Sequence, residues 1–189
     1  KKCGFPLEGN QECTHHKGLI ELDLESQIAI VGYYKTDFNS QPLNSLSKRI
    51  LEMRTPEGLK YFYELVLLLN VLYHNNIKSM NIKWGTWVPS SNQLLVKIAK
   101  KVITDNNIIL IDPKELFCFN LNITKSKNNK YYVNEKYKLK KNIDSRYLEI
   151  INNKEGIVID DILHTCFTIG RILELLEDLC PKKILCLAL

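Results

Sequence analysis

Residues 156–168, Gly-Ile-Val-Ile-Asp-Asp-Ile-Leu-His-Thr-Cys-Phe-Thr, decide how the fold is interpreted. The apolar run predicts a buried strand that delivers two adjacent carboxylates, Asp160 and Asp161, to its carboxyl end. A short loop follows, and apolar side chains at helical spacing predict a helix over residues 168–180. Residues 184–189 predict a final apolar strand. The stretch therefore predicts a strand–loop–helix–strand unit of a parallel sheet.

The rest of the chain repeats this alternation of apolar strands and helices. The helix predicted over residues 59–73 is apolar on most sides, so we expect it to be buried. Residues 115–123 and 130–139 predict a β excursion or a long hairpin. Apolar strands separated by helices predict an α/β fold with a parallel sheet covered on both faces. Further strands are expected at residues 27–35, 81–88 and 108–111, and further helices at residues 42–53 and 92–102.

The composition is that of a globular protein. Of the 189 residues, 45% are hydrophobic and 25% are charged, which excludes a disordered or collagen-like chain. We expect one domain over residues 19–189 and a small appendage over residues 1–18. The longest apolar run, residues 184–189, is far shorter than the ~20 residues of a membrane span. With no secretory signal visible, we expect the six cysteines to lie in a reducing cytoplasm.

The loop after the predicted strand suits a phosphorylated sugar. A helix N-terminus offers backbone N–H groups and the positive end of its dipole to a phosphate. Thr165 and Thr168 can add hydroxyl donors, while Asp160 and Asp161 can accept hydrogen bonds from a vicinal diol or hold Mg²⁺ through water. The alternative is structural: the aspartates end a strand, and one threonine caps the helix.

A basic segment, residues 124–141, carries the excess positive charge. It holds seven lysines and one glutamate, a balance of +6, against +5 for the whole chain. Lysines with interleaved tyrosines suit the phosphates and stacked bases of single-stranded DNA. A solvated, lysine-rich surface loop or hairpin is the alternative. The residues expected to contact a nucleic acid are Lys125, Lys127, Lys130, Tyr131 and Tyr132.

The appendage brings potential zinc ligands close together along the chain. Cys3 and Cys13 are separated by turn-forming residues, and His15 and His16 follow. A closed structural zinc site needs four ligands. We expect Cys3, Cys13 and His16 to contribute to such a site, since adjacent histidines rarely bind one ion together. A metal-free flap is the alternative, because the ligand spacing is incomplete.

Residues 157–168 resemble the phosphoribosyl-diphosphate loop of type I phosphoribosyltransferases, in which an apolar strand precedes two acids and a threonine-rich turn. Other positions are similar to the ComF group, competence protein F and its relatives. Cys3-Gly-Phe-Pro-Leu followed by Cys13 resembles the zinc finger of that group. Residues 87–89, Trp-Val-Pro, resemble the end of its first core strand, and residues 92–93, Asn-Gln, the start of its next helix.

The resemblance implies a type I phosphoribosyltransferase-like sheet flanked by helices, with a zinc-finger-like appendage. It implies a cytoplasmic protein of DNA uptake that binds phosphoribosyl diphosphate with Mg²⁺, and Zn²⁺ in the appendage. Competence proteins and single-stranded DNA are the implied partners. Asp160 and Asp161 take the catalytic positions. The implied phosphate-binding residues are His164, Thr165, Cys166, Phe167 and Thr168, and the implied diphosphate loop is Pro89, Ser90 and Ser91.

Three positions depart from the loop pattern of the family. His164 replaces a threonine, Cys166 replaces a glycine and Phe167 replaces a small residue. A glycine lets backbone N–H groups approach a phosphate without a Cβ in the way, so Cys166 opposes tight phosphate binding. Three functions stay open: a phosphosugar-binding protein of DNA uptake, an active phosphoribosyltransferase acting on a nucleobase-like acceptor, and a non-catalytic interaction module with a degenerate site.

Overall fold

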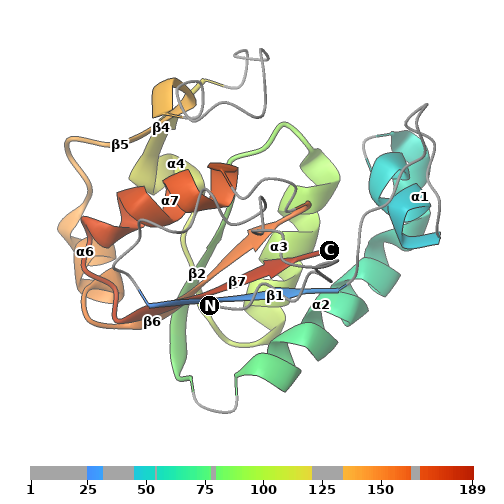
Figure 1. Cartoon of the computed structure of the whole chain (residues 1–189), viewed down its shortest axis with the longest axis horizontal. Helices are drawn as coiled ribbons and strands as arrows, with labels where there is room; N and C mark the ends of the chain where they lie inside the picture. The colour runs from blue at the N-terminus through green and yellow to red at the C-terminus, as the bar shows by residue number, and fades with distance from the viewer. Residues whose placement is uncertain (1–24, 32–44, 54, 78–79, 121–133, 163–166) are drawn as a thin grey trace, which may run out of the picture.

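A five-stranded parallel sheet forms the centre of the protein in the computed structural model (Figure 1). The structure describes residues 25–31, 45–53, 55–77, 80–120, 134–162 and 167–189. The strand order is β1-β7-β6-β2-β3, which leaves β1 and β3 at the edges and β6 in the middle. The bounds of the strands are β1 Ser26–Ile30, β2 Ile82–Trp87, β3 Ile109–Leu110, β6 Glu155–Asp160 and β7 Lys183–Ala188.

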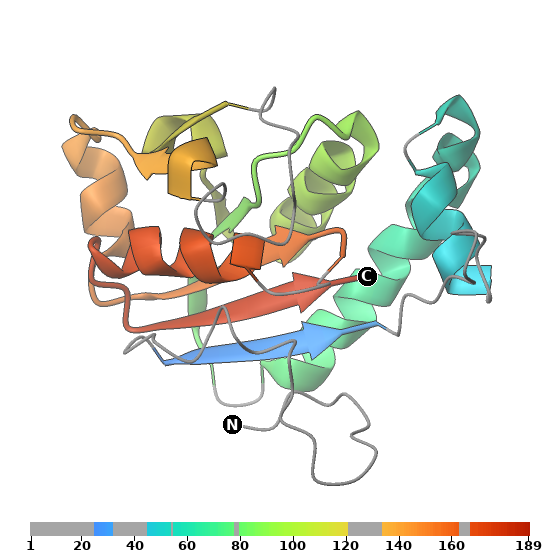
Figure 2. The same cartoon turned by 45° about the horizontal axis from the view of Figure 1, so that its top comes forward.

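Helices cover both faces of this sheet, and Figure 2 shows the strands between α7 and α2. Buried side chains of α2 and α3 pack on one face, and those of α7 pack on the other. A separate antiparallel hairpin consists of β4 Phe117–Phe119 and β5 Tyr137–Leu139. The bounds of the helices are α1 Ser45–Glu52, the 3₁₀ helix η2 Pro56–Tyr61, α2 Phe62–Asn76, α3 Gln93–Asp105, α4 Pro113–Leu116, α6 Ser145–Ile151 and α7 Phe167–Glu177.

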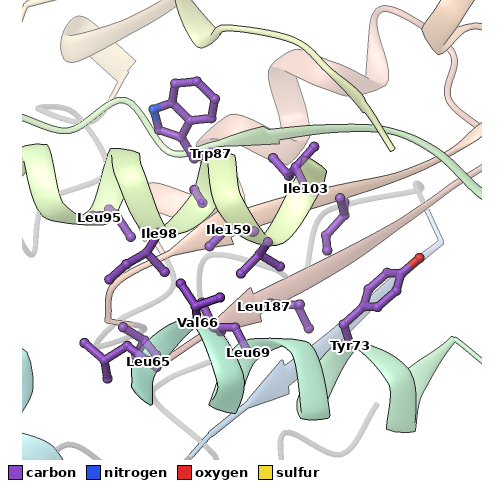
Figure 3. Close-up of a cluster of buried hydrophobic side chains, with 14 of the residues drawn as sticks. Leu65, Val66, Leu69, Tyr73, Trp87, Leu95, Ile98, Ile103, Ile159 and Leu187 are labelled. Atoms are coloured by element: carbon purple, nitrogen blue, oxygen red, sulfur yellow. The ribbon is translucent and has the colours of Figure 1, made fainter. Parts of the chain in front are cut away.

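The apolar run of β6 is explained by burial on both faces. Ile157 and Ile159 point to the α2–α3 layer, and Val158 points to the α7 layer. Figure 3 shows Ile159 among side chains of α2 and α3. Gly156 faces the indole of Trp84 in β2, where a Cβ would lie 2.2 Å from the ring. The close approach of β2 to β6 therefore depends on a glycine at this position.

The chain leaves the sheet centre in opposite directions from β2 and from β6. From β2 it runs through α3 to β3 on one side, and from β6 it runs through α7 to β7 on the other. The two crossover helices therefore lie on opposite faces, as in a doubly wound sheet. The boundary between β2 and β6 is the topological switch point. In open α/β sheets, ligands bind outside the carboxyl ends of the strands at this point.

The predicted α/β fold with a parallel sheet flanked by helices is confirmed. The hairpin predicted from residues 115–123 and 130–139 forms, with shorter strands. The sequence prediction did not include α4 and α6, which are single short helices of four and seven residues. Too few turns are present in either helix for an apolar period to stand out.

The expectation that residues 59–73 are buried on most sides is wrong. The segment divides into η2 and α2, and only one face of α2 packs on the sheet. The opposite face of α2 exposes Tyr63, Leu67 and Val71, and η2 exposes Leu59, with between 51% and 77% of each residue exposed. None of the helices in the described ranges has the length and hydropathy needed to span a bilayer. The appendage predicted at residues 1–18 lies outside the described residues.

Candidate functional site

The carboxyl ends of β6 and β2 meet at the switch point and bring two predicted segments together. β6 ends at Asp160, and Asp161 follows it. The N–H of Val88 donates to the carbonyl of Ile159 at 2.9 Å, so the chain after β2 continues beside the end of β6. This pairing places residues 89–91 next to the two aspartates. The structure thus brings together the predicted acidic pair and the predicted diphosphate loop.

Asp160 is a buried carboxyl group with 6% of its surface exposed. Side chains alternate along a strand, so Asp160 follows Val158 to the face covered by α7. One carboxylate oxygen of Asp160 accepts a hydrogen bond from the N–H of Asp161 at 2.8 Å. Burial raises the pKa of Asp160 well above its ordinary value, the charge of Asp161 raises it further, and the charge of Lys136 opposes this. The fold therefore disfavours the ionised form of Asp160.

Asp161 is the more accessible carboxylate of the pair. It is half-buried, and its Oδ1 accepts a hydrogen bond from the N–H of Ile162 at 2.9 Å. This bond uses one of the acceptor positions of a group that has about four. Asp161 is therefore the more exposed of the two carboxyl groups at this edge of the sheet.

The loop after β2 is held by hydrogen bonds of its own. The Oγ of Ser90 accepts from the N–H of Asn92 at 3.0 Å, while Ser91 is exposed. Asn92 caps α3, because its Oδ1 accepts from the N–H groups of Leu94 and Leu95. The Nδ2 of Asn92 is buried, and no described group accepts a hydrogen bond from it. The predicted diphosphate loop thus presents serine hydroxyls and a helix N-terminus at the switch point.

Tyr137 of the hairpin reaches this edge from β5. Its side chain is 2% exposed, and its hydroxyl donates to the carbonyl of Pro89 at 3.4 Å. The Nε of Arg171 in α7 donates to the carbonyl of Tyr137 at 3.3 Å. Burial raises the pKa of Tyr137, and the charges of Asp160 and Asp161 raise it further.

Tyr137 was missed as a site residue in the sequence, where it is one of three tyrosines in the basic segment. The acidic pair lies 23 residues further along the chain, and only the hairpin brings the two together. Lys136 lies beside it, with its Nζ 5.1 Å from the ring centroid of Tyr137. The signal that could have found Tyr137 is its place near the end of residues 130–139, the second strand of the predicted hairpin.

The structure describes some of the other predicted site residues. Phe167 and Thr168 form the first turn of α7 and are half-buried, and Phe167 packs against the apolar cluster beneath that helix. The remaining predicted residues lie outside the described residues: His164, Thr165 and Cys166 of the phosphate loop, Cys3, Cys13 and His16 of the zinc site, and Lys125, Lys127, Lys130, Tyr131 and Tyr132 of the nucleic-acid patch.

The described residues can hold Mg²⁺ in one manner. No group of three or more His, Cys, Asp or Glu side chains with metal-site geometry occurs in the part of the chain that the structure describes. Mg²⁺ needs fewer protein ligands when it arrives with a ligand, because it keeps several waters and uses one or two carboxylates with the ligand's phosphates. The half-buried carboxylate of Asp161, with Asp160 behind it, fits that donor set.

In comparisons with known proteins, no family model and no curated protein matches the chain. Among solved structures, the chain is similar to a hypoxanthine-guanine phosphoribosyltransferase from Bacillus anthracis str. 'Ames Ancestor', at 16% identity over 68% of this chain and 65% of that one, with a TM-score of 0.42. Two crystal forms of a hypoxanthine phosphoribosyltransferase from Staphylococcus aureus also match. The tetragonal form gives 17% identity, 69% and 62% coverage and a TM-score of 0.42. The orthorhombic form gives 15%, 78%, 65% and 0.38.

The chain spans less than two thirds of the length of each of these enzymes. All three TM-scores are low, so neither the family nor a function follows from them.

Proposed function

We propose that the protein binds phosphoribosyl diphosphate or a related phosphosugar at the carboxyl ends of β6 and β2. One observation carries the proposal: two adjacent carboxylates end the central strand at the switch point of a doubly wound sheet. The resemblance of residues 157–168 to a phosphoribosyl-diphosphate loop supports the same ligand class. An apolar strand that only ended in a turn would not need two carboxyl groups, one of them buried.

Each part of the edge has a role in this proposal. Asp161 accepts hydrogen bonds from sugar hydroxyls, since it is the more accessible of the two aspartates. Helix α7 has 11 residues and begins at Phe167, so its first N–H groups and dipole favour a phosphate there, with the Thr168 hydroxyl as a further donor. Ser90 and Ser91 supply hydroxyls for a second phosphate. When bound with the ligand, Mg²⁺ neutralises part of the phosphate charge.

A role in DNA uptake of the ComF type is the finer part of the proposal. It rests on the sequence resemblance and on the basic segment at residues 124–141. Of the seven lysines in this segment, four lie in the described part of the hairpin: Lys136, Lys138, Lys140 and Lys141. Single-stranded DNA bound by these lysines would lie along β5. Removal of these charges weakens binding and flattens its salt dependence if the proposal holds.

Calorimetry with phosphoribosyl diphosphate and MgCl₂ tests the binding site. We expect saturable heat with the wild type and at least about tenfold weaker binding for Asp161→Asn, because a hydrogen bond to a charged group contributes about 1.5–3 kcal/mol. Asp178→Asn is the matched control, since Asp178 is exposed at the far end of α7. No heat with the wild type, or equal affinity for Asp161→Asn, contradicts the proposal.

The same preparation separates binding from catalysis. A phosphoribosyltransferase releases diphosphate when a nucleobase acceptor is added to the complex, whereas a binding protein does not. A coupled assay for diphosphate with each common nucleobase therefore decides between the two. Release above the uncatalysed rate, lost in Asp161→Asn, would move the protein into the catalytic class.

A further inference from the structure

Tyr137 makes contacts on both sides of the proposed site. Its hydroxyl reaches the loop after β2 at Pro89, and its carbonyl accepts from Arg171 of α7. Its neighbours in the hairpin, Cys118 and Lys138, are exposed, whereas Tyr137 itself is 2% exposed. The hairpin thus buries Tyr137 of β5 together with Phe117 of β4, and the Tyr137 hydroxyl reaches the loop after β2.

The side chain of Tyr137 packs beside the carboxyl end of β6. Tyr137 packs in the same cluster as Val88 and Val158, which flank Asp160 on the face covered by α7. Asp160 is 6% exposed, while the next residue, Asp161, is half-buried. The hydroxyl of Tyr137 contacts Pro89, and the preceding residue, Val88, donates its N–H to Ile159, the residue before Asp160. The phenol therefore contributes to the burial of Asp160.

The contact that ends at Pro89 is a weak one. At 3.4 Å, the bond from the Tyr137 hydroxyl to this neutral carbonyl is near the long limit for an O–H donor. The hairpin itself is held more tightly, since the N–H of Lys140 donates to Leu116 at 2.9 Å and that of Asn120 donates to Lys136 at 3.1 Å. Tyr137 can therefore leave Pro89 while the hairpin stays paired.

We propose that the side chain of Tyr137 occupies the place of the ligand beside Asp160, and that a bound sugar displaces it. The carbonyl of Pro89, to which the phenol donates, can only accept hydrogen bonds, and the carboxyl group of Asp160 keeps an acceptor oxygen in either protonation state. A group that replaces the phenol must therefore donate hydrogen bonds, and sugar hydroxyls do so whereas phosphate oxygens do not. The inference rests on the proposed function and adds that the sugar, not the diphosphate, opens the edge.

The direction in which Tyr137→Phe changes the affinity for the ligand tests this displacement. Tyr137→Phe removes the hydrogen bond to Pro89 and keeps the ring, so the covered state loses stability relative to the open one. Apparent affinity rises with the fraction of protein in the open state. We expect phosphoribosyl diphosphate with MgCl₂ to bind about 3- to 10-fold more tightly to Tyr137→Phe than to the wild type. Tyr73→Phe is the matched control, because Tyr73 is buried in α2 on the other face of the sheet (Figure 3).

A spectroscopic measurement follows the displacement in the wild type itself, and the two variants serve to assign the signals. In protein with ¹³C-labelled tyrosine rings, the signal of Tyr137 is the one missing from Tyr137→Phe, and that of Tyr73 is the one missing from Tyr73→Phe. Ligand should move the Tyr137 signal toward the position of an exposed tyrosine and leave that of Tyr73 in place. A tyrosine with a merely structural role would keep its signal.

The outcomes separate this inference from the proposed function. Tighter binding by Tyr137→Phe together with the shifted signal supports the displacement. Binding by the wild type with equal or weaker binding by Tyr137→Phe overturns the displacement and leaves the proposed function intact. Absence of binding by all three proteins removes the proposed function and the displacement with it.

Discussion

Strand β6 begins at Glu155 and ends at Asp160, and both residues are buried, with 7% and 6% of their surface exposed. Glu155 accepts a hydrogen bond from the N–H of Asn81 and pairs with Lys182 at 3.1 Å. These partners hold the pKa of Glu155 below its ordinary value. At the other end, burial and the charge of Asp161 hold the pKa of Asp160 well above its ordinary value.

The difference separates a structural carboxylate from a candidate functional one. Glu155 links the strands on either side of β6, because Asn81 lies just before β2 and Lys182 just before β7. Asp160 has as partners the backbone N–H of Asp161 and the carboxyl group of the same residue, whose charge opposes its own. A fold that keeps a buried carboxyl group in a setting that opposes its charge gives up stability there. Such groups concentrate at sites that bind or react.

Removal of the structural carboxylate should have the largest effect. Glu155→Ala leaves the N–H of Asn81 without its acceptor and Lys182 without its partner, while the lysine stays solvated because 63% of its side chain is exposed. We expect a loss of about 2–3 kcal/mol in the free energy of unfolding. Urea denaturation measures it. Glu64→Ala is the control, since its pair with Arg49 at 3.0 Å lies at the surface and contributes at most about 1 kcal/mol. Equal losses would contradict the assignment of Glu155.

Asp160→Asn should stabilise the fold, in contrast to Glu155→Ala. The amide keeps the shape and an acceptor oxygen and carries no charge to bury. We expect the free energy of unfolding at pH 7 to rise by about 1 kcal/mol, while binding of phosphoribosyl diphosphate weakens. Thermal unfolding and calorimetry measure the two quantities. A less stable Asp160→Asn would show that the ionised carboxylate has a partner that stabilises it.

The stability contributions of Asp160 and Glu155 should depend on pH in opposite directions, because the pKa of Asp160 is raised in the folded chain and that of Glu155 is lowered. Below the ordinary pKa of 3.8, Asp160 is protonated in both folded and unfolded chains; as pH rises, only the unfolded chain ionises, so the wild type loses stability relative to Asp160→Asn. Glu155 stabilises the fold above its ordinary pKa of 4.5 and ceases to as pH falls through its lower folded value. Unfolding curves from pH 3 to about pH 8 should show both trends, and parallel curves would contradict them.

The sequence predicts the end of β6 better than its beginning. The apolar run marks the strand, and adjacent acids after such a run are unusual enough to be noticed. Glu155 gives no such signal, because a lone glutamate before a strand usually faces water. Its role depends on Asn81, which lies 74 positions earlier in the chain and meets it only through the parallel pairing of β2 with β6.

Tyr137 and α2 show the same limit of local patterns. Hydrophobic periodicity locates the elements, and long-range packing decides what covers them. The tyrosine at the start of β5 belongs to a lysine-rich segment and still becomes one of the most buried side chains, because the hairpin folds over the edge of the sheet. Conversely, the apolar segment predicts that Tyr63 and Leu67 are buried, but both lie on the face of α2 that points away from the sheet.

The smallest expected effect lies between the two ends of β6. Thr86 of β2 pairs with Val158, and its Oγ1 is buried with no hydrogen-bond partner in the described part of the chain. Valine has the same shape without the hydroxyl, so Thr86→Val should raise the free energy of unfolding by about 0.5–1 kcal/mol. Affinity for phosphoribosyl diphosphate should stay unchanged, because Thr86 lies inside the strand rather than beyond its end.

Differential scanning calorimetry beside the binding assay checks both expectations for Thr86→Val. A gain in stability with unchanged affinity places the ligand at the end of the strands, where Asp160 and Asp161 stand. A loss of affinity would mean that the hydroxyl of Thr86 faces the bound ligand. In that case the binding site extends one residue pair deeper into the sheet, to the pair of Thr86 with Val158. The difference between the interior and the end of the strand would then not hold at this position.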